Sequence, residues 1–179
     1  MTVLVIIALL VVAAAIVYAF LEKHPVYGAY YGLAKLTGSR IDIGPVDWAT
    51  LTRHTTPNDA LVCPAGHCPK AKADEEPKVY PVAPGELLAH MKRVARAEPD
   101  TKELPCGPHC DHAARFVQYT KLMRYPDTID VDVIPAGENQ STLALYSRSL
   151  VGRKDFGVNR ARVARWLGAL ERLSHGLKR

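Results

Sequence analysis

The sequence predicts an α+β domain, an antiparallel sheet with packed helices, preceded by a single N-terminal transmembrane helix. Residues 2–21 form an uncharged apolar run, and residues 128–149 contain two alternating apolar/polar stretches separated by a loop. Apolar residues recur at helical spacing in residues 84–97 and from residue 158 to about residue 177. Because the predicted strands follow one another and helices flank them, an antiparallel sheet with helices packed on it is expected.

The apolar run is long enough to cross a membrane, since about 20 helical residues span about 30 Å of hydrocarbon. It is apolar on all sides, unlike the one-sided stripe of a helix packed on a core. A cleaved signal peptide is not favoured, because no Lys or Arg precedes the run and no Ala-x-Ala site ends it. We therefore expect residues 1–22 to be a retained anchor, with residues 2–21 in contact with the lipid bilayer.

Composition divides the remaining chain into two parts. Residues 23–58 contain several Gly and Pro and are expected to be a connector, whereas residues 59–179 are expected to form the α+β domain. The chain has 179 residues, 48% of them hydrophobic, and a formal net charge of +5. This composition is typical of a globular protein, and the mild charge does not indicate a nucleic-acid-binding protein.

The clearest local patterns are one helix and one hairpin. A helix is predicted over 84–97, because Pro84 suits a first helical turn and Pro99 prevents continuation. A strand is predicted over 116–123. A second strand, 128–134, places Ile129, Val131 and Val133 on a buried face and Asp130 and Asp132 on the opposite face, expected to be solvent-exposed, and a third strand, 142–149, completes the hairpin.

The last element predicted is an amphipathic helix from Val158 to about residue 177. Its apolar stripe consists of Val163, Trp166, Leu167, Leu170, Leu173 and Leu177. Three arginines, Arg162, Arg165 and Arg172, are expected on the other, solvated face.

Three stretches of the chain are distinctive as motifs. They are Pro57-Asn-Asp-Ala-Leu-Val-Cys-Pro64, Leu122-Met-Arg-Tyr-Pro-Asp127 and Ser147-Arg-Ser-Leu-Val-Gly-Arg-Lys-Asp-Phe-Gly-Val-Asn-Arg160. With these stretches the chain resembles the bacterial and plastid family called domain of unknown function 1499, over about residues 45–175. The resemblance supplies no activity and no catalytic residue, but it implies a membrane-associated or exported bacterial protein.

The four cysteines form two clusters, each with a His immediately before its second Cys. We expect disulfides among Cys63, Cys68, Cys106 and Cys110, either within each cluster or between the clusters, because spacing alone does not fix the connectivity. The alternative is a zinc site built from these cysteines together with His67 and His109. Zinc sites usually place two residues between paired cysteines, whereas these clusters contain four and three.

The expected location follows from the disulfides. Lys23, Lys35 and Arg40 follow the apolar run, and by the positive-inside rule they would keep the domain in the cytoplasm. Disulfides instead form and persist in oxidising compartments such as the periplasm. We therefore expect a single-pass protein of the bacterial inner membrane with its C-terminal domain on the periplasmic side.

Positive charge is concentrated at the end of the chain, where residues 148–179 contain nine Lys or Arg and two acidic residues. A helix start offers unpaired backbone N–H groups that can bind an anion. The candidate anion-binding residues are Arg148, Ser149, Arg153, Lys154, Asn159 and Arg160. The structural alternative pairs Arg148 with Asp155 or with another, inward-facing carboxylate.

No motif for a known catalytic mechanism is present, since the chain lacks a Gly-x-Ser-x-Gly elbow, a phosphate-binding Walker loop and a dinucleotide fingerprint. We therefore expect a membrane-anchored, non-catalytic binding or assembly module without a cofactor. Its partners would be a membrane protein complex or anionic head groups, and not nucleic acid. One alternative is a metal-binding or redox protein that uses the Cys/His clusters. Another is a small enzyme, for which Asp130 and Asp132 would form a carboxylate pair.

Overall fold

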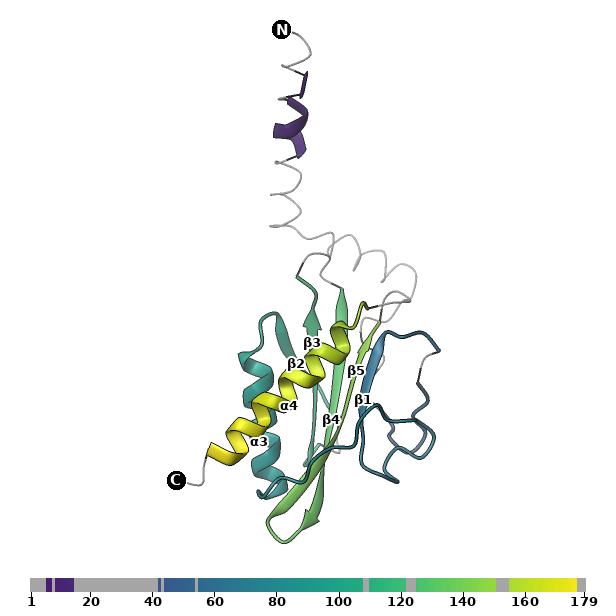
Figure 1. Ribbon diagram of the computed structural model, residues 1–179, viewed down its shortest axis with the longest axis vertical. Helices are drawn as coiled ribbons and strands as arrows, with labels where there is room; N and C mark the ends of the chain where they lie inside the picture. Colours follow the sequence, from purple (N-terminus) through teal and green to yellow (C-terminus); the bar gives the residue numbers. More distant parts are fainter. Residues whose placement is uncertain are drawn as a thin grey trace.

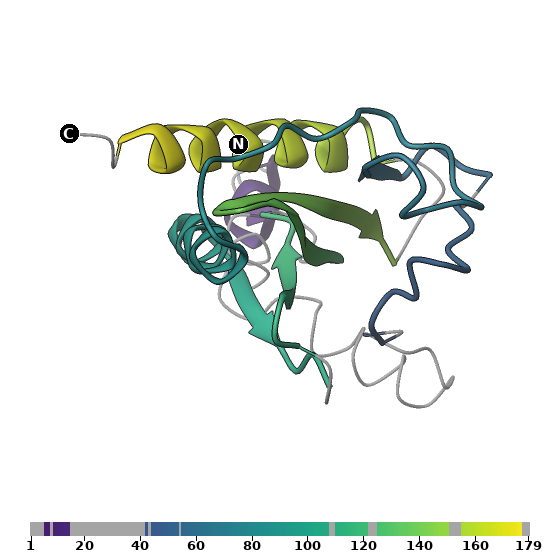
Figure 2. The same ribbon diagram turned by 90° about the horizontal axis from the view of Figure 1, so that it is seen from below.

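The computed structural model describes residues 6, 7, 9–14, 42, 44–53, 55–107, 110–121, 125–150 and 155–176. Five antiparallel strands form one sheet in the order β1-β5-β4-β3-β2. In chain order the elements are β1 (Asp59–Val62), α3 (Pro84–Ala97), β2 (Thr101–Leu104), β3 (Ala113–Tyr119), β4 (Pro126–Gly137), β5 (Gln140–Ser149) and α4 (Val158–Gly176). Both helices pack on the same face of the sheet (Figures 1 and 2). The predicted α+β class with an antiparallel sheet is confirmed.

Helix α3 has the predicted bounds. Pro84 lies in its first turn, where the missing N–H leaves no hydrogen bond unmade, and Glu98 has extended backbone ahead of Pro99. The apolar face is buried, with Leu87, Leu88, Met91, Val94 and Ala95 all packed in the core.

The β4–β5 hairpin is the longest unit of the sheet and extends the predicted hairpin at both ends. Val131 pairs with Leu145 and Val133 with Leu143, which places these side chains together in the main core. Helix α4 covers this core with Trp166, whose indole meets Phe116 of β3 edge-to-face at 5.6 Å between ring centroids.

The second face of the sheet is also covered. Residues that precede and follow β1 pack on this face. Together with the sheet they form a second, smaller core, which consists of Leu51, Leu61, Cys63, Cys68, Ala144 and Tyr146 and is flanked by Val46 and Trp48. Arg53 fixes the segment by pairing with Asp59 at 2.6 Å and with Asp74 at 2.9 Å. Residues 44–53, predicted as part of the connector, therefore pack against the domain.

Two predicted solvent-exposed positions are wrong. Asp130 is only 2% exposed, because Asp42 and residues 44–53 cover the sheet face that the alternating pattern assigned to water. Arg162 is also 2% exposed, because its side chain pairs with the buried Asp127 on β4. Arg165 and Arg172 lie on the solvated side of α4 as expected.

The predicted anchor falls mostly outside the described residues. Within it, residues 6, 7 and 9–14 are helical and exposed. No helix in the described part of the chain has both the length and the apolar character needed to cross a membrane.

Candidate functional site

A row of charged side chains crosses the second face of the sheet, beneath Asp42 and residues 44–53. Arg115 of β3 lies opposite Asp130 of β4 in the strand register, and its Nε donates a 2.8 Å hydrogen bond to Oδ1 of Asp130. Arg148 of β5 lies opposite Thr128, donates to its hydroxyl from Nε at 3.2 Å, and places Nη2 3.6 Å from Oδ2 of Asp130. Cross-strand pairing therefore sets one buried carboxylate between two buried guanidinium groups.

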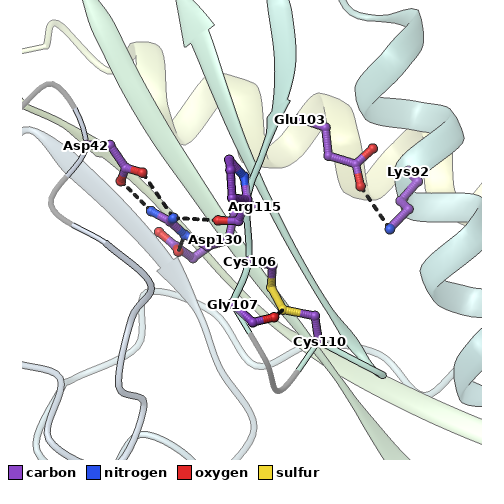
Figure 3. Close-up of a disulfide and its surroundings, with 9 residues drawn as sticks. Asp42, Lys92, Glu103, Cys106, Gly107, Cys110, Arg115 and Asp130 are labelled. Carbon is purple, nitrogen blue, oxygen red and sulfur yellow. Dashed lines mark hydrogen bonds and ion pairs between the residues drawn. A yellow bond between two sulfur atoms is a disulfide. The ribbon is translucent and has the colours of Figure 1, made fainter.

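Arg115 is held in place from both sides (Figure 3). Its Nη1 donates to Oδ2 of Asp42 at 3.1 Å and to the carbonyl of Pro105 at 3.0 Å, and its Nη2 donates to Oδ1 of Asp42. The Cys106–Cys110 disulfide follows directly after Pro105 in the chain. Arg115 thus connects the segment before β1, the centre of the sheet and the loop between β2 and β3.

Asp130 is buried with an incomplete set of partners. Its Oδ2 has no hydrogen bond of standard geometry among the described residues, and Nη2 of Arg148 lies 3.6 Å away. Burial is the largest influence on the pKa of Asp130 and raises it. The hydrogen bonds from Arg115 and from the backbone of Val46, together with the charges of Arg148 and Arg115, only partly oppose that rise. A buried acceptor that lacks a donor is costly, so such groups in native proteins are often functional.

Beside this row lies a cleft of about 300 Å³. Its lining includes the half-buried Trp48 and two carboxylate residues, Asp130 and Asp132, which alternate onto the same face of β4. The residues that line the cleft are Pro45, Val46, Trp48, Cys106, Gly107, Ala113, Arg115, Asp130, Val131 and Asp132. Its volume is at the small end of the range found for ligand pockets.

Asp132 gives the cleft a second carboxylate. Its side chain is 25% exposed, and its Oδ2 lies 3.0 Å from Nε2 of His67, whose ring is 5.8 Å from that of Trp48. Burial raises the pKa of Asp132, while the nearby His67 and His112 act to lower it. Asp132 is therefore a carboxylate within reach of a ligand, beside an aromatic wall.

The charges around the cleft do not cancel. Asp42 and Asp130 pair with Arg115 and Arg148, and Asp132 lies beside His67, which leaves one net negative charge when His67 and His112 are neutral. Four of the five N–H groups of Arg115 already donate to protein acceptors. The arrangement therefore suits a ligand that brings a hydrogen-bond donor or a positive charge rather than an anion.

A separate polar network lies under the start of α4, on the other face of the sheet. Arg162 donates to Asp127 at 2.7 Å, to Ser147 at 2.9 Å and to Asn159 at 2.6 Å, and its Nε donates to Gln118. Each of these five side chains is buried. Because every group has a partner, this network joins α4 to three strands and leaves little capacity for a ligand.

The structure distributes the predicted anion-binding residues over different contacts. Arg148 is buried on the second face beside Asp130, in agreement with the alternative that an inward-facing carboxylate pairs with it. Ser149 donates to Asp127, and Asn159 is fully buried and accepts a 2.6 Å hydrogen bond from Ser147. The Arg160 side chain is 77% exposed and lies 3.4 Å from Asp74. Arg153 and Lys154 lie outside the described residues.

The cysteines form two disulfides, each within one cluster: Cys63–Cys68 and Cys106–Cys110. Cys63 and Cys68 are buried in the smaller core, whereas Cys106 and Cys110 are half-buried. His67 lies next to Asp132 rather than with a second cluster, and His109 lies outside the described residues. Within the ranges that the structure describes, no three His, Cys, Asp or Glu side chains are grouped so as to hold a metal ion.

Sequence reasoning missed Arg115, Asp42 and Trp48 as residues of the site. One available signal was a pair of opposite charges at two predicted neighbouring strands, with Arg115 directly before the first and Asp130 within the second. Opposite charges directly across from each other on adjacent strands attract, so this pair could have been predicted to be in contact. Nothing local in the sequence connects Asp42 or Trp48 to residues more than sixty positions later.

The family model for "Protein of unknown function (DUF1499)" matches residues 51–170. The chain belongs to this family. The DUF1499 match includes Arg115, Asp130 and Asp132 in the lining of the cleft and begins after Trp48. No curated protein and no solved structure shows significant similarity to the chain.

Proposed function

We propose that the protein is a non-catalytic binding module whose cleft takes a small ligand with an amine or another hydrogen-bond-donating group on an apolar body. The observation that carries the proposal is the cleft itself, whose lining combines Trp48 and Val46 with Asp130 and Asp132. An apolar wall with a few polar groups is the usual design of small-molecule sites. The apolar wall would bind the body of the ligand, and the carboxylates would orient its donor.

The module is proposed to be anchored in the bacterial inner membrane by residues 2–21, with the domain on the periplasmic side. The uncharged apolar run supports the anchor. The two disulfides support the periplasmic side, because such bonds are rare in proteins of the reducing cytoplasm. A reporter that is active only in the periplasm, fused after Arg179, should be active, and the protein should stay in membranes through a carbonate wash. Activity only from a cytoplasmic reporter would contradict the topology.

The ligand class can be tested with two probes of equal shape and opposite charge, benzylamine and benzoate. Trp48 lines the cleft, whereas the only other tryptophan, Trp166, is fully buried in the main core. We expect benzylamine to shift the tryptophan emission in a saturable way, and benzoate to leave it unchanged. Asp132→Asn should weaken benzylamine binding about tenfold, the loss of roughly one charge-assisted hydrogen bond.

The control variant is Glu138→Gln, which removes a carboxylate from the exposed β4–β5 turn far from the cleft. It should bind benzylamine as the parent protein does. Equal responses to the amine and the carboxylate, or equal losses in the two variants, would contradict the proposed ligand class.

A further inference from the structure

Phe156 is the most exposed large apolar side chain of the folded domain that the structure describes. It is 95% exposed, and Val158, two residues later, is 42% exposed. The backbone of Phe156 has φ 54°, in the left-handed region that bulky residues seldom adopt. A strained, water-exposed aromatic residue calls for a functional explanation, since neither feature favours folding.

The turn that carries Phe156 is firmly attached to the domain. Asp155 accepts hydrogen bonds at 2.9 Å from the backbone N–H groups of Gly157 and Asn159. Asn159 is fully buried and donates from Nδ2 to the carbonyl of Asn58 at 3.0 Å, just before β1. The ring of Phe156 is therefore held outward by a fixed turn.

This turn lies at the end of the sheet near which the chain from the predicted anchor enters the domain. Tyr119 pairs with Pro126 and Asp127 with Ser149, so the end of β3, the start of β4 and the end of β5 are neighbours there. Gly44, among the first described residues after the connector, accepts a hydrogen bond from Arg148 at 3.4 Å, one residue before the end of β5. Figure 1 shows α4 starting at this end of the sheet.

The described residues at this end combine exposed apolar side chains with an exposed cation. Phe156 and Val158 are exposed at the start of α4, and Lys121 is exposed after the end of β3. The carboxylate of the nearby Asp155 is occupied by the hydrogen bonds of the turn. Apolar and aromatic residues beside Lys and Arg are typical of surfaces that lie in the head-group layer of anionic membranes.

We propose that this end of the domain, with Phe156, Val158 and Lys121 on its surface, rests on the anionic bilayer and inserts Phe156 among the head groups. The proposal builds on the anchor proposed above, which would keep the domain within reach of the membrane. The bilayer would cover the exposed ring, and its anionic lipids would pair with Lys121. The strain at Phe156 would then serve to present the ring to the membrane.

The test uses the full-length chain in lipid vesicles, with its disulfides intact so that an introduced cysteine is the reactive thiol. Phe156→Cys and, as control, Val79→Cys would each be labelled with a nitroxide. Val79 is a matched control because it is 55% exposed and precedes Tyr80, which pairs with Ser141 near the opposite end of the sheet. Collisions with oxygen, which concentrates in lipid, and with a water-soluble nickel chelate would then be compared by electron paramagnetic resonance.

In vesicles of phosphatidylcholine with a quarter phosphatidylglycerol, the ratio of oxygen to nickel collisions should be several-fold higher at position 156 than at position 79. This difference should shrink in pure phosphatidylcholine, because the anionic head groups would be missing. Equal ratios at the two positions in chains that float with the vesicles would overturn the proposal and leave the anchor intact. Chains that do not float with the vesicles would overturn both.

Discussion

At the scale of single residues, Arg162 is a buried charge on which the stability of the fold depends. Its guanidinium is 2% exposed and contacts Asp127, Gln118, Ser147 and Asn159, which come from three strands and its own helix. Removing one partner of such a network leaves the others without hydrogen bonds in a medium that solvates them poorly.

We therefore expect Arg162→Met to lower the free energy of unfolding by about 3–5 kcal/mol, because it leaves the Asp127 carboxylate buried without its cation. Urea unfolding followed by circular dichroism measures this. The matched control is Arg165→Met on the same helix, whose side chain is 54% exposed and pairs with Glu98. Arg165→Met should lower the free energy of unfolding by less than about 1 kcal/mol. Equal losses in the two variants would contradict a special role for the buried network.

Phe156 should behave in the opposite way. Phe156→Asn is expected to raise the free energy of unfolding by up to about 1 kcal/mol, because Asn adopts positive φ more readily and a ring that is 95% exposed contributes little packing. A thermal melt in detergent, without a bilayer, measures the change. A marked loss of stability would show that the ring makes contacts within the protein and would count against its presentation to a membrane.

At the scale of elements, the two disulfides close loops of similar length in different surroundings. Cys63 and Cys68 are 4% and 6% exposed and belong to the smaller core, whereas Cys106 and Cys110 are half-buried beside the cleft. By loop entropy alone, each bond would contribute about 2 kcal/mol.

We expect mild reductant to open Cys106–Cys110 before Cys63–Cys68, because a thiolate can reach the half-buried sulfurs without opening the core. Brief treatment with dithiothreitol, followed by alkylation and peptide mass spectrometry, shows the order. Alkylation of Cys63 at the same rate as Cys106 would mean that the smaller core opens readily, contrary to the burial seen here.

Elements set by local periodicity could be predicted from the sequence, whereas elements set by distant contacts could not. Helix α3 and the β4–β5 hairpin follow from periodicity within a single stretch, so their positions were predicted closely. Strands β1 and β2 have four residues each, and β1 is fixed by pairing with β5, more than eighty positions away. The burial of Asp130 depends likewise on Asp42 and residues 44–53, and the cleft exists only where these residues cross the sheet. Patterns along the chain carry no information about such distant contacts.

At the scale of the whole molecule, the carboxylates give the fold a definite pH dependence. Partial burial acts to raise the pKa of Asp74, but hydrogen bonds from Arg53 and from the backbone N–H of Leu61 outweigh it and lower the pKa below 3.8. A carboxyl group whose pKa is lowered by folding stabilises the folded state at pH values above its pKa in the unfolded chain. This contribution is lost as pH falls through its pKa in the folded protein.

We therefore expect Asp74→Asn to destabilise the protein at neutral pH and to reduce the stability lost on acidification below about pH 4. Urea unfolding across this range measures both effects. Asp132→Asn serves as the comparison of opposite sign, because burial raises the pKa of Asp132. Ionisation of Asp132 therefore lowers the stability of the parent protein as pH rises above 3.8, and Asp132→Asn should remove this loss. Parallel pH profiles for the two variants would contradict the opposite environments of these carboxylates.

The two edge strands of the sheet are protected against edge-to-edge aggregation. In the sheet only β1 and β2 have an open side, and exposed strand edges are templates for aggregation. Residues after the first disulfide lie along β1, where Val62 forms a parallel bridge with Glu75 and Leu61 donates its N–H to Asp74. Strand β2 is short and exposes Lys102 and Glu103. One edge of the sheet is therefore covered by the residues around Glu75, and the other is short and charged. An assembly of these domains would be built through loops and helix surfaces rather than by extending the sheet.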